Sequence, residues 1–171
     1  MEYKSAKDYV EKAEWFRKEY FIDPETGEVY DYWKPNIHRV CAGLNRYIEA
    51  QNKVDPYLNK DVFHIALDEI KAGKKKTHWI WFIFPQLAGL GKSEKSEFYG
   101  ICHRDEAHDY INNPLLRDRL VEAAEAVYNN EKSVYEIFGH DAIRVRSCML
   151  LFASVSDIPI FRRMIQKYAW K

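Results

Sequence analysis

The sequence predicts an all-α fold: a single compact domain of about seven to nine helices with an irregular N-terminal arm. Three observations support this class. Apolar residues recur every three or four positions through most of the 171-residue chain. Helix start signals such as Asn113-Pro114 and stop signals such as Gly73 separate these periodic stretches. Stretches that could form strands are too few for a sheet-based fold, and no repeat or low-complexity linker divides the chain.

The N-terminal part is predicted to form a helix over residues 6–21, followed by a Pro- and Gly-containing turn at 23–27. An irregular arm then carries three aromatic side chains, Tyr30, Tyr32 and Trp33. A second helix is predicted to open at Pro35-Asn36 and to run through Tyr47 and Ile48.

The remaining helices are placed by their caps. Asp61 is the predicted N-cap of a third helix, with Gly73 at its C-terminal stop. Further helices are expected at 93–99, 105–111 and 114–128, after Ser133 to about Phe138, after Asp141, and from Asp157-Ile158-Pro159 to near the C-terminus.

The other elements are arranged around the stretch from Lys74 to Ser93, KKKTHWIWFIFPQLAGLGKS. Its apolar run is interrupted by Pro85 and is too short to span a membrane, which needs about 20 apolar residues. It is therefore expected to be part of the core. Periodicity leaves residues 78–84 open between strand and helix, but either element should end at Phe84, before the proline.

Net charge, cysteine spacing and the N-terminal residues each disfavour certain classes of protein. Lys plus Arg and Asp plus Glu both number 26, so no overall charge favours nucleic acid or anionic lipid. The three cysteines, Cys41, Cys102 and Cys148, are widely spaced, which indicates neither a disulfide framework nor a zinc knuckle. No secretory signal is recognisable, so we expect a cytoplasmic protein, outside the membrane and without cofactor or metal.

Gly91-Lys92-Ser93 resembles the end of a phosphate-binding loop, but Gln86 occupies the position of the first glycine. A nucleotide-hydrolysing fold of that type is therefore disfavoured. Two alternatives stay open for the same loop, namely an anion site assisted by Lys92 and a plain loop leading into a helix cap.

Two further patterns have weaker alternatives. The lysine run 74–76 beside Trp79 and Trp81 could contact nucleic acid, but such a run is more often a solvated surface. Cys102-His103 with His108 does not match a zinc pattern. We therefore expect neither nucleic acid nor metal as a ligand.

Several motifs in the central and C-terminal regions resemble domain-of-unknown-function family 1810. They are, in order, LNRYIEAQ from Leu44, ALDEI from Ala66, HWIWFIFPQL from His78, LGKS from Leu90, YGI from Tyr99, EA at 106–107, Tyr110, RL at 119–120, IFG from Ile137 and RSCMLLF from Arg146. The resemblance covers about residues 44–168 and implies a mainly helical domain, found largely in bacteria, with no established activity.

The chain also departs from that family pattern. Residues 1–43 resemble an addition to a helical core domain at 44–171, and residues 52–59 resemble an insertion. Arg144, Cys148 and Leu150 stand where the family usually has lysine, serine and threonine.

Two hypotheses for function follow. In the first, the HWIWFIFPQ segment binds a small anionic or nucleotide-like ligand, and turnover of that ligand stays open. Trp79 or Trp81 would stack, Gln86 would supply an amide, Lys92 with Arg144 or Arg146 would supply positive charge, and His78 would be the candidate catalytic residue. In the second, the chain is a non-catalytic protein-interaction module that uses its N-terminal arm or an exposed aromatic patch.

Overall fold

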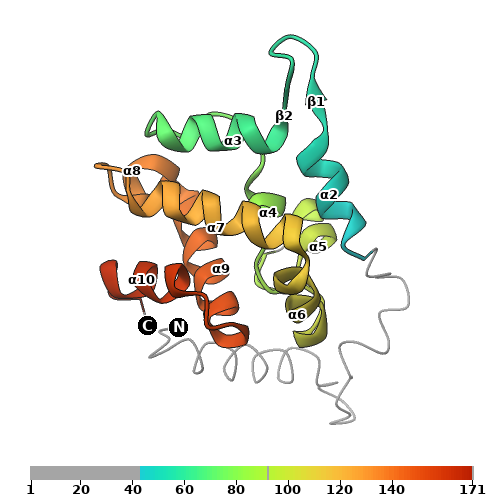
Figure 1. Ribbon diagram of the computed structural model, residues 1–171, viewed down its shortest axis with the longest axis vertical. Helices are drawn as coiled ribbons and strands as arrows, with labels where there is room; N and C mark the ends of the chain where they lie inside the picture. The colour runs from blue at the N-terminus through green and yellow to red at the C-terminus, as the bar shows by residue number, and fades with distance from the viewer. Residues whose placement is uncertain (1–42, 92, 171) are drawn as a thin grey trace.

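The computed structural model describes residues 43–91 and 93–170, which form a set of packed helices and one short hairpin (Figure 1). The all-α prediction is confirmed. The helix predicted at 6–21, the turn at 23–27 and the aromatic arm lie outside the described residues. No helix in the described ranges is long and apolar enough to cross a bilayer.

The elements follow in chain order. They are α2 (Asn45–Asn52), β1 (Val54–Asp55), β2 (Lys60–Asp61), α3 (Val62–Lys71), α4 (Ile80–Ile83), α5 (Glu94–Tyr99), α6 (Arg104–Asn112), α7 (Pro114–Tyr128), α8 (Val134–Phe138), the 3-10 turn η1 (Gly139–Asp141), α9 (Ala142–Val155) and α10 (Pro159–Lys167).

Most predicted helix starts are confirmed by side-chain caps. The carboxylate of Asp61 accepts from the His64 N–H at 2.8 Å, and Asn113 accepts from Leu116 N–H at 3.1 Å. Ser133 forms a capping box with Glu136. Asp141 precedes α9 as predicted, but its side chain makes no capping bond, because it faces Lys75 and Arg144 instead.

The second predicted helix is wrong in its start. The helix that holds Tyr47 and Ile48 begins at Asn45, not at Pro35. Gly43 adopts a φ of +71°, a left-handed conformation that cannot continue a right-handed helix. The hairpin β1–β2 was not predicted from the sequence, since its strands are two residues each and carry no alternating pattern.

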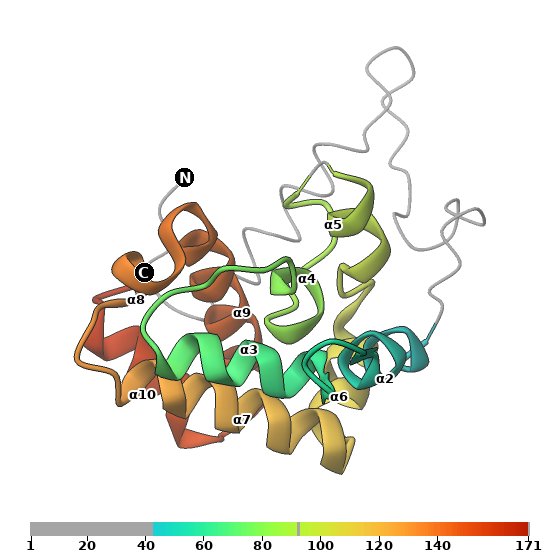
Figure 2. The ribbon, with the colours of Figure 1, turned by 90° about the horizontal axis from the view of Figure 1, so that it is seen from above.

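The core is shared among several helices. In Figure 1, α3 lies above α7 and α10 lies below it, and α9 packs against α10, α6 and α8. Figure 2, seen from above, shows α3 running alongside α7. Helix α9 contributes the longest buried stretch, from Ser147 to Ala153. The buried faces of α3 and α7 include Phe63, Leu67, Leu116 and Leu120.

The central stretch forms only one turn of helix, α4, whose last residue is Ile83 and whose C-cap is Phe84, the predicted end. The loop before it is held by the carboxylate of Glu69 on α3. This carboxylate accepts hydrogen bonds from the backbone N–H groups of Lys76 and Thr77, from the Thr77 hydroxyl and from Trp79 Nε1. Partial burial alone would raise the pKa of Glu69, but these hydrogen bonds outweigh it and lower the pKa below its ordinary value.

Replacing Glu69 with glutamine is expected to lower the free energy of unfolding by about 1–3 kcal/mol at neutral pH, because the charged acceptor of several hydrogen bonds is lost. A group whose folded-state pKa is lowered stabilises the protein above its ordinary pKa, which is 4.5 for this carboxyl. The stability gap between wild type and variant should therefore shrink as the pH falls below about 4.5. Urea unfolding of both proteins at pH 7, 5, 4 and 3 measures this difference in stability.

The matched control is Glu125→Gln, since Glu125 is an exposed carboxylate on α7. That variant should unfold within about 0.5 kcal/mol of wild type at every pH. If the difference in unfolding free energy between wild type and Glu69→Gln stays constant from pH 7 to pH 3, the negative charge of Glu69 does not contribute to stability and the prediction is wrong.

Candidate functional site

A small cavity lies where α4, the segment after it, α5 and α9 meet. Its volume is about 10 Å³, which is near the space needed for one water-sized atom. Seven residues line it, namely Trp81, Phe84, Gln86, Ser96, Tyr99, Gly100 and Arg144.

Trp81, one of the lining residues, carries a buried polar atom without a partner. Its Nε1 is buried and has no hydrogen-bond partner, and among the described side chains it is the only such buried nitrogen or oxygen. A buried N–H without an acceptor costs about 1–3 kcal/mol. The Lys95 ammonium lies 4.8 Å from the centroid of the same ring, in a cation–π contact.

Arg144 joins α9 to α5 beside the cavity. Its Nη1 donates to the Ser96 hydroxyl oxygen at 2.9 Å, and the Ser93 hydroxyl lies 2.8 Å from the same oxygen. The Arg144 Nε also lies 3.7 Å from Asp141, whose other oxygen is 3.2 Å from the Lys75 ammonium. The guanidinium is thus held in place while about a quarter of the side chain, 23%, stays exposed.

The backbone around Gln86 is fixed by a short parallel bridge between Leu87 and Ile101. The Ile101 N–H donates to the Gln86 carbonyl at 2.8 Å, and the Ala88 N–H donates to the Ile101 carbonyl at 2.9 Å. Two glycines permit this close packing. A Cβ at Gly100 would lie 2.6 Å from the Ala88 Cα, and one at Gly91 would lie 2.6 Å from the Ser96 side chain.

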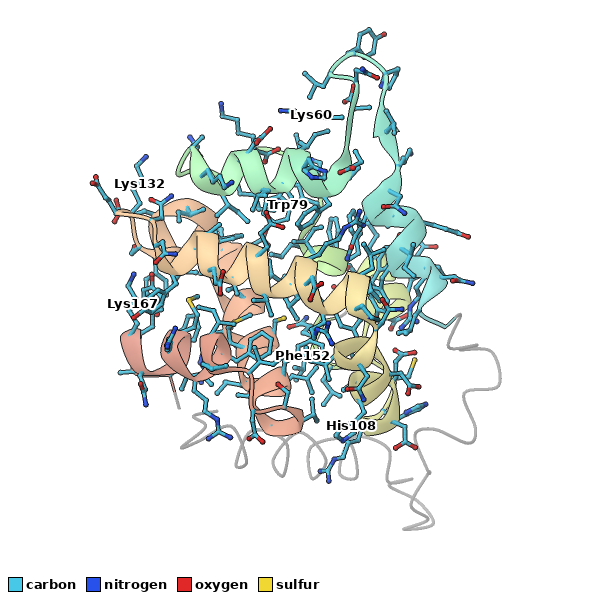
Figure 3. All side chains as sticks on the ribbon, in the orientation of Figure 1. Lys60, Trp79, His108, Lys132, Phe152 and Lys167 are labelled. Carbon is cyan, nitrogen blue, oxygen red and sulfur yellow. The ribbon has the colours of Figure 1, made fainter. Side chains whose placement is uncertain are left out.

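The structure therefore brings together three of the predicted site residues, Trp81, Gln86 and Arg144. Trp79 does not line the cavity, since it is fully buried against Phe84 and Phe138, inside the bundle with Phe152 (Figure 3). His78 is exposed on the loop before it, and Arg146 is half-buried on α9 outside the lining. Lys92 lies outside the described residues.

Sequence reasoning missed four lining residues, namely Phe84, Ser96, Tyr99 and Gly100. Ser96 had a usable signal, because it stands three residues after Ser93, where an N-capping side chain accepts a backbone N–H. Tyr99 had none, since only the packing of α5 brings it to the cavity.

A buried ion pair supports α5 from the opposite side, and it too was missed. Arg46 and Glu106 lie 2.6 Å apart with side chains only 2% and 6% exposed. Arg46 also donates to the carbonyls of Phe98 and Gly100, and the Tyr47 hydroxyl donates to the Tyr99 carbonyl. These bonds satisfy the carbonyls at the C-terminal end of α5, which no residue of its own helix can reach.

A larger open groove of about 570 Å³ lies elsewhere, at the C-terminal ends of α3 and α7. It is lined by side chains of both charges, among them Lys71, Glu122, Glu125 and Lys132. None of the predicted site residues lines it. Its size alone is therefore no reason to prefer it to the small cavity, which is lined by three predicted residues, one of which, Trp81, carries a buried donor without a partner.

The family model described as protein of unknown function (DUF1810) matches residues 41–170, which is most of the chain. The chain belongs to the DUF1810 family. This confirms the resemblance noted from its motifs. The matched range also contains the cavity and the ion pair that supports it.

One solved structure has a similar fold. It is the crystal structure of the conserved hypothetical protein Rv1873 from Mycobacterium tuberculosis, which is 38% identical in sequence. The match covers 74% of this chain and 86% of that one, with a TM-score of 0.66. The comparison with curated proteins finds no match.

Proposed function

We propose that this DUF1810 protein binds a small anionic ligand, one oxygen atom of which enters the cavity beside Trp81. The observation that carries the proposal is the buried Trp81 Nε1, a hydrogen-bond donor aligned with no acceptor. An oxygen atom in the cavity would remove the cost of that unpaired donor.

The surroundings of this donor favour an anion over a neutral ligand. The Ser96 oxygen is approached by both Arg144 and Ser93, which leaves its own hydrogen to be donated elsewhere. Gln86 adds an amide that can also donate. Arg144 and Lys95 add positive charge beside these donors, and the Asp141 carboxylate, 3.7 Å from the Arg144 Nε, is shared with Lys75 and so offsets only part of it.

The cavity volume limits what can enter. About 10 Å³ accommodates a single oxygen, so the body of the ligand would lie at the mouth, beside Lys95 and Arg144. A phosphate or carboxylate group on a larger molecule, including a nucleotide, meets this requirement. The described lining residues include no carboxylate or histidine for proton transfer, so the proposal concerns binding and not turnover.

The test is isothermal titration with inorganic phosphate, adenosine monophosphate and glucose 6-phosphate at constant ionic strength. We expect at least one of these probes to bind. Trp81→Phe, which keeps an aromatic ring and removes the N–H, should weaken that binding about tenfold or more, and Arg144→Gln should do the same.

The matched control is Arg163→Gln, since Arg163 is an exposed arginine on α10, away from the cavity lining. Its affinity for the same probe should equal that of wild type. The proposal is wrong if none of the three probes binds, or if binding persists unchanged in both Trp81→Phe and Arg144→Gln.

A further inference from the structure

The hairpin β1–β2 projects from the helical body as a narrow extension above α2 and α3 (Figure 1). It pairs Val54 with Asp61 and Asp55 with Lys60 in antiparallel register. Its turn places Tyr57 and Leu58 in solvent, with exposed fractions of 96% and 60%, and Val54 on β1 is 55% exposed. Such side chains contribute nothing to the core of the domain.

The tip is held in one conformation. One carboxylate oxygen of Asp55 accepts from the backbone N–H groups of Tyr57 and Leu58, at 2.8 and 3.2 Å. Asn59 adopts a left-handed φ of +50°, which closes the turn. A tip that these bonds already order loses less entropy on binding than a disordered one would.

The charged groups of the stem already have partners within the chain. Asp55 is engaged by the turn, Asp61 accepts from His64, and Lys60 pairs with Asp68. What the tip offers outward is therefore mainly apolar surface and the phenol hydroxyl of Tyr57. This chemistry fits a concave apolar pocket that holds one hydrogen-bond acceptor at its base.

We propose that the β1–β2 hairpin is a docking element that inserts Tyr57 and Leu58 into an apolar pocket of a different protein. Three side chains present on the order of a few hundred Å². A stable interface buries about 800 Å² on each partner. The tip alone is therefore too small to hold two copies of this chain together, and it suits a short-lived complex with a partner that supplies the pocket.

A membrane surface is the less suitable occupant. The formal net charge of the chain is zero, and Lys60 and the carboxylates of the stem are paired. The exposed Lys53 before β1 is one positive charge, which adds only about 1 kcal/mol of attraction to anionic lipid. The strands are also two residues long, too short for a partner strand to add along their edges. Insertion of the tip side chains into a pocket of the partner protein is the remaining mode of binding.

The experiment places a photo-crosslinking phenylalanine analogue at Tyr57 of the full chain in cells of the source organism and, in parallel, at Ile143 on α9. Ile143 is 62% exposed, close to the 60% of Leu58, and serves as the matched position. We expect one protein to be crosslinked from Tyr57 and not from Ile143. That protein is then purified and titrated with wild type, Tyr57→Ser, Leu58→Ser and Ile143→Ser.

Both tip variants should weaken the measured affinity by about tenfold or more, while Ile143→Ser leaves it unchanged. Because Tyr57 is almost wholly exposed, Tyr57→Ser should also keep the wild-type melting temperature, which separates lost docking from lost folding. The proposal is overturned by crosslinks only to lipid or to a second copy, by no crosslinked protein beyond the Ile143 control, or by unchanged affinity in both tip variants.

Discussion

Glu106→Gln is expected to lower the free energy of unfolding by about 3–5 kcal/mol, because it leaves the Arg46 guanidinium buried without its countercharge. The two side chains are almost fully enclosed, and Glu106 also accepts from the Cys102 backbone N–H at 3.1 Å. For a chain of this length the loss corresponds to a fall in melting temperature of roughly 10 °C. Urea unfolding and calorimetry measure both.

The matched control is Asp68→Asn at the exposed Lys60–Asp68 pair, whose side chains are 51% and 54% exposed. An exposed ion pair contributes only about 0–1 kcal/mol, so this variant should be nearly as stable as wild type. Replacing both buried partners, as in Arg46→Met with Glu106→Leu, should cost less than the two single changes added together. If Glu106→Gln and Asp68→Asn lower the free energy of unfolding equally, the burial of the Arg46–Glu106 pair does not increase the cost of breaking it.

Trp79→Ala is expected to cost about 3–5 kcal/mol, since it removes a fully buried ring from the core and leaves a cavity. The ring meets Phe138 edge-on at 5.8 Å between centroids, and its Nε1 donates to Glu69 at 3.1 Å. Chemical denaturation followed by circular dichroism gives the loss without depending on tryptophan fluorescence.

A comparison of Trp79→Phe with Trp81→Phe isolates the indole N–H. At Trp79 the change breaks a hydrogen bond and leaves the Glu69 carboxylate with one donor fewer. At Trp81 it removes a buried N–H that has no partner, so the penalty of that unpaired donor also disappears. We expect Trp79→Phe to be the less stable variant, and the reverse order would show that Trp81 Nε1 has a partner in the folded protein.

Local signals predicted the helical elements well. Ser133, Asn113 and Asp61 cap the helices expected of them, because a cap depends on a few neighbouring residues. The start of α2 was wrong because an apolar pattern continued past Gly43, and pattern alone does not reveal a left-handed φ. The central stretch was undecidable because four helical residues are too few to establish a period.

The candidate site was predicted only in part. Trp81, Gln86 and Arg144 were selected for their chemistry, and the structure places them around one cavity. The choice between Trp79 and Trp81 could not be made from sequence, since it depends on which indole donates to Glu69 and which lines the cavity together with Arg144. The Arg46–Glu106 pair joins residues 60 positions apart, and a local sequence pattern cannot predict such a contact.

The capping of α5 by residues of α2 bears on local motion. A six-residue helix with mostly exposed side chains would ordinarily fray, and its amide hydrogens would exchange with solvent through small openings. Here its last carbonyls accept hydrogen bonds from Arg46 and Tyr47 of α2, and Arg46 is itself held by the buried pair with Glu106. Unwinding the C-terminal end of α5 therefore also breaks its bonds to α2, and we expect its amide hydrogens to exchange more slowly than those of a six-residue helix without such bonds.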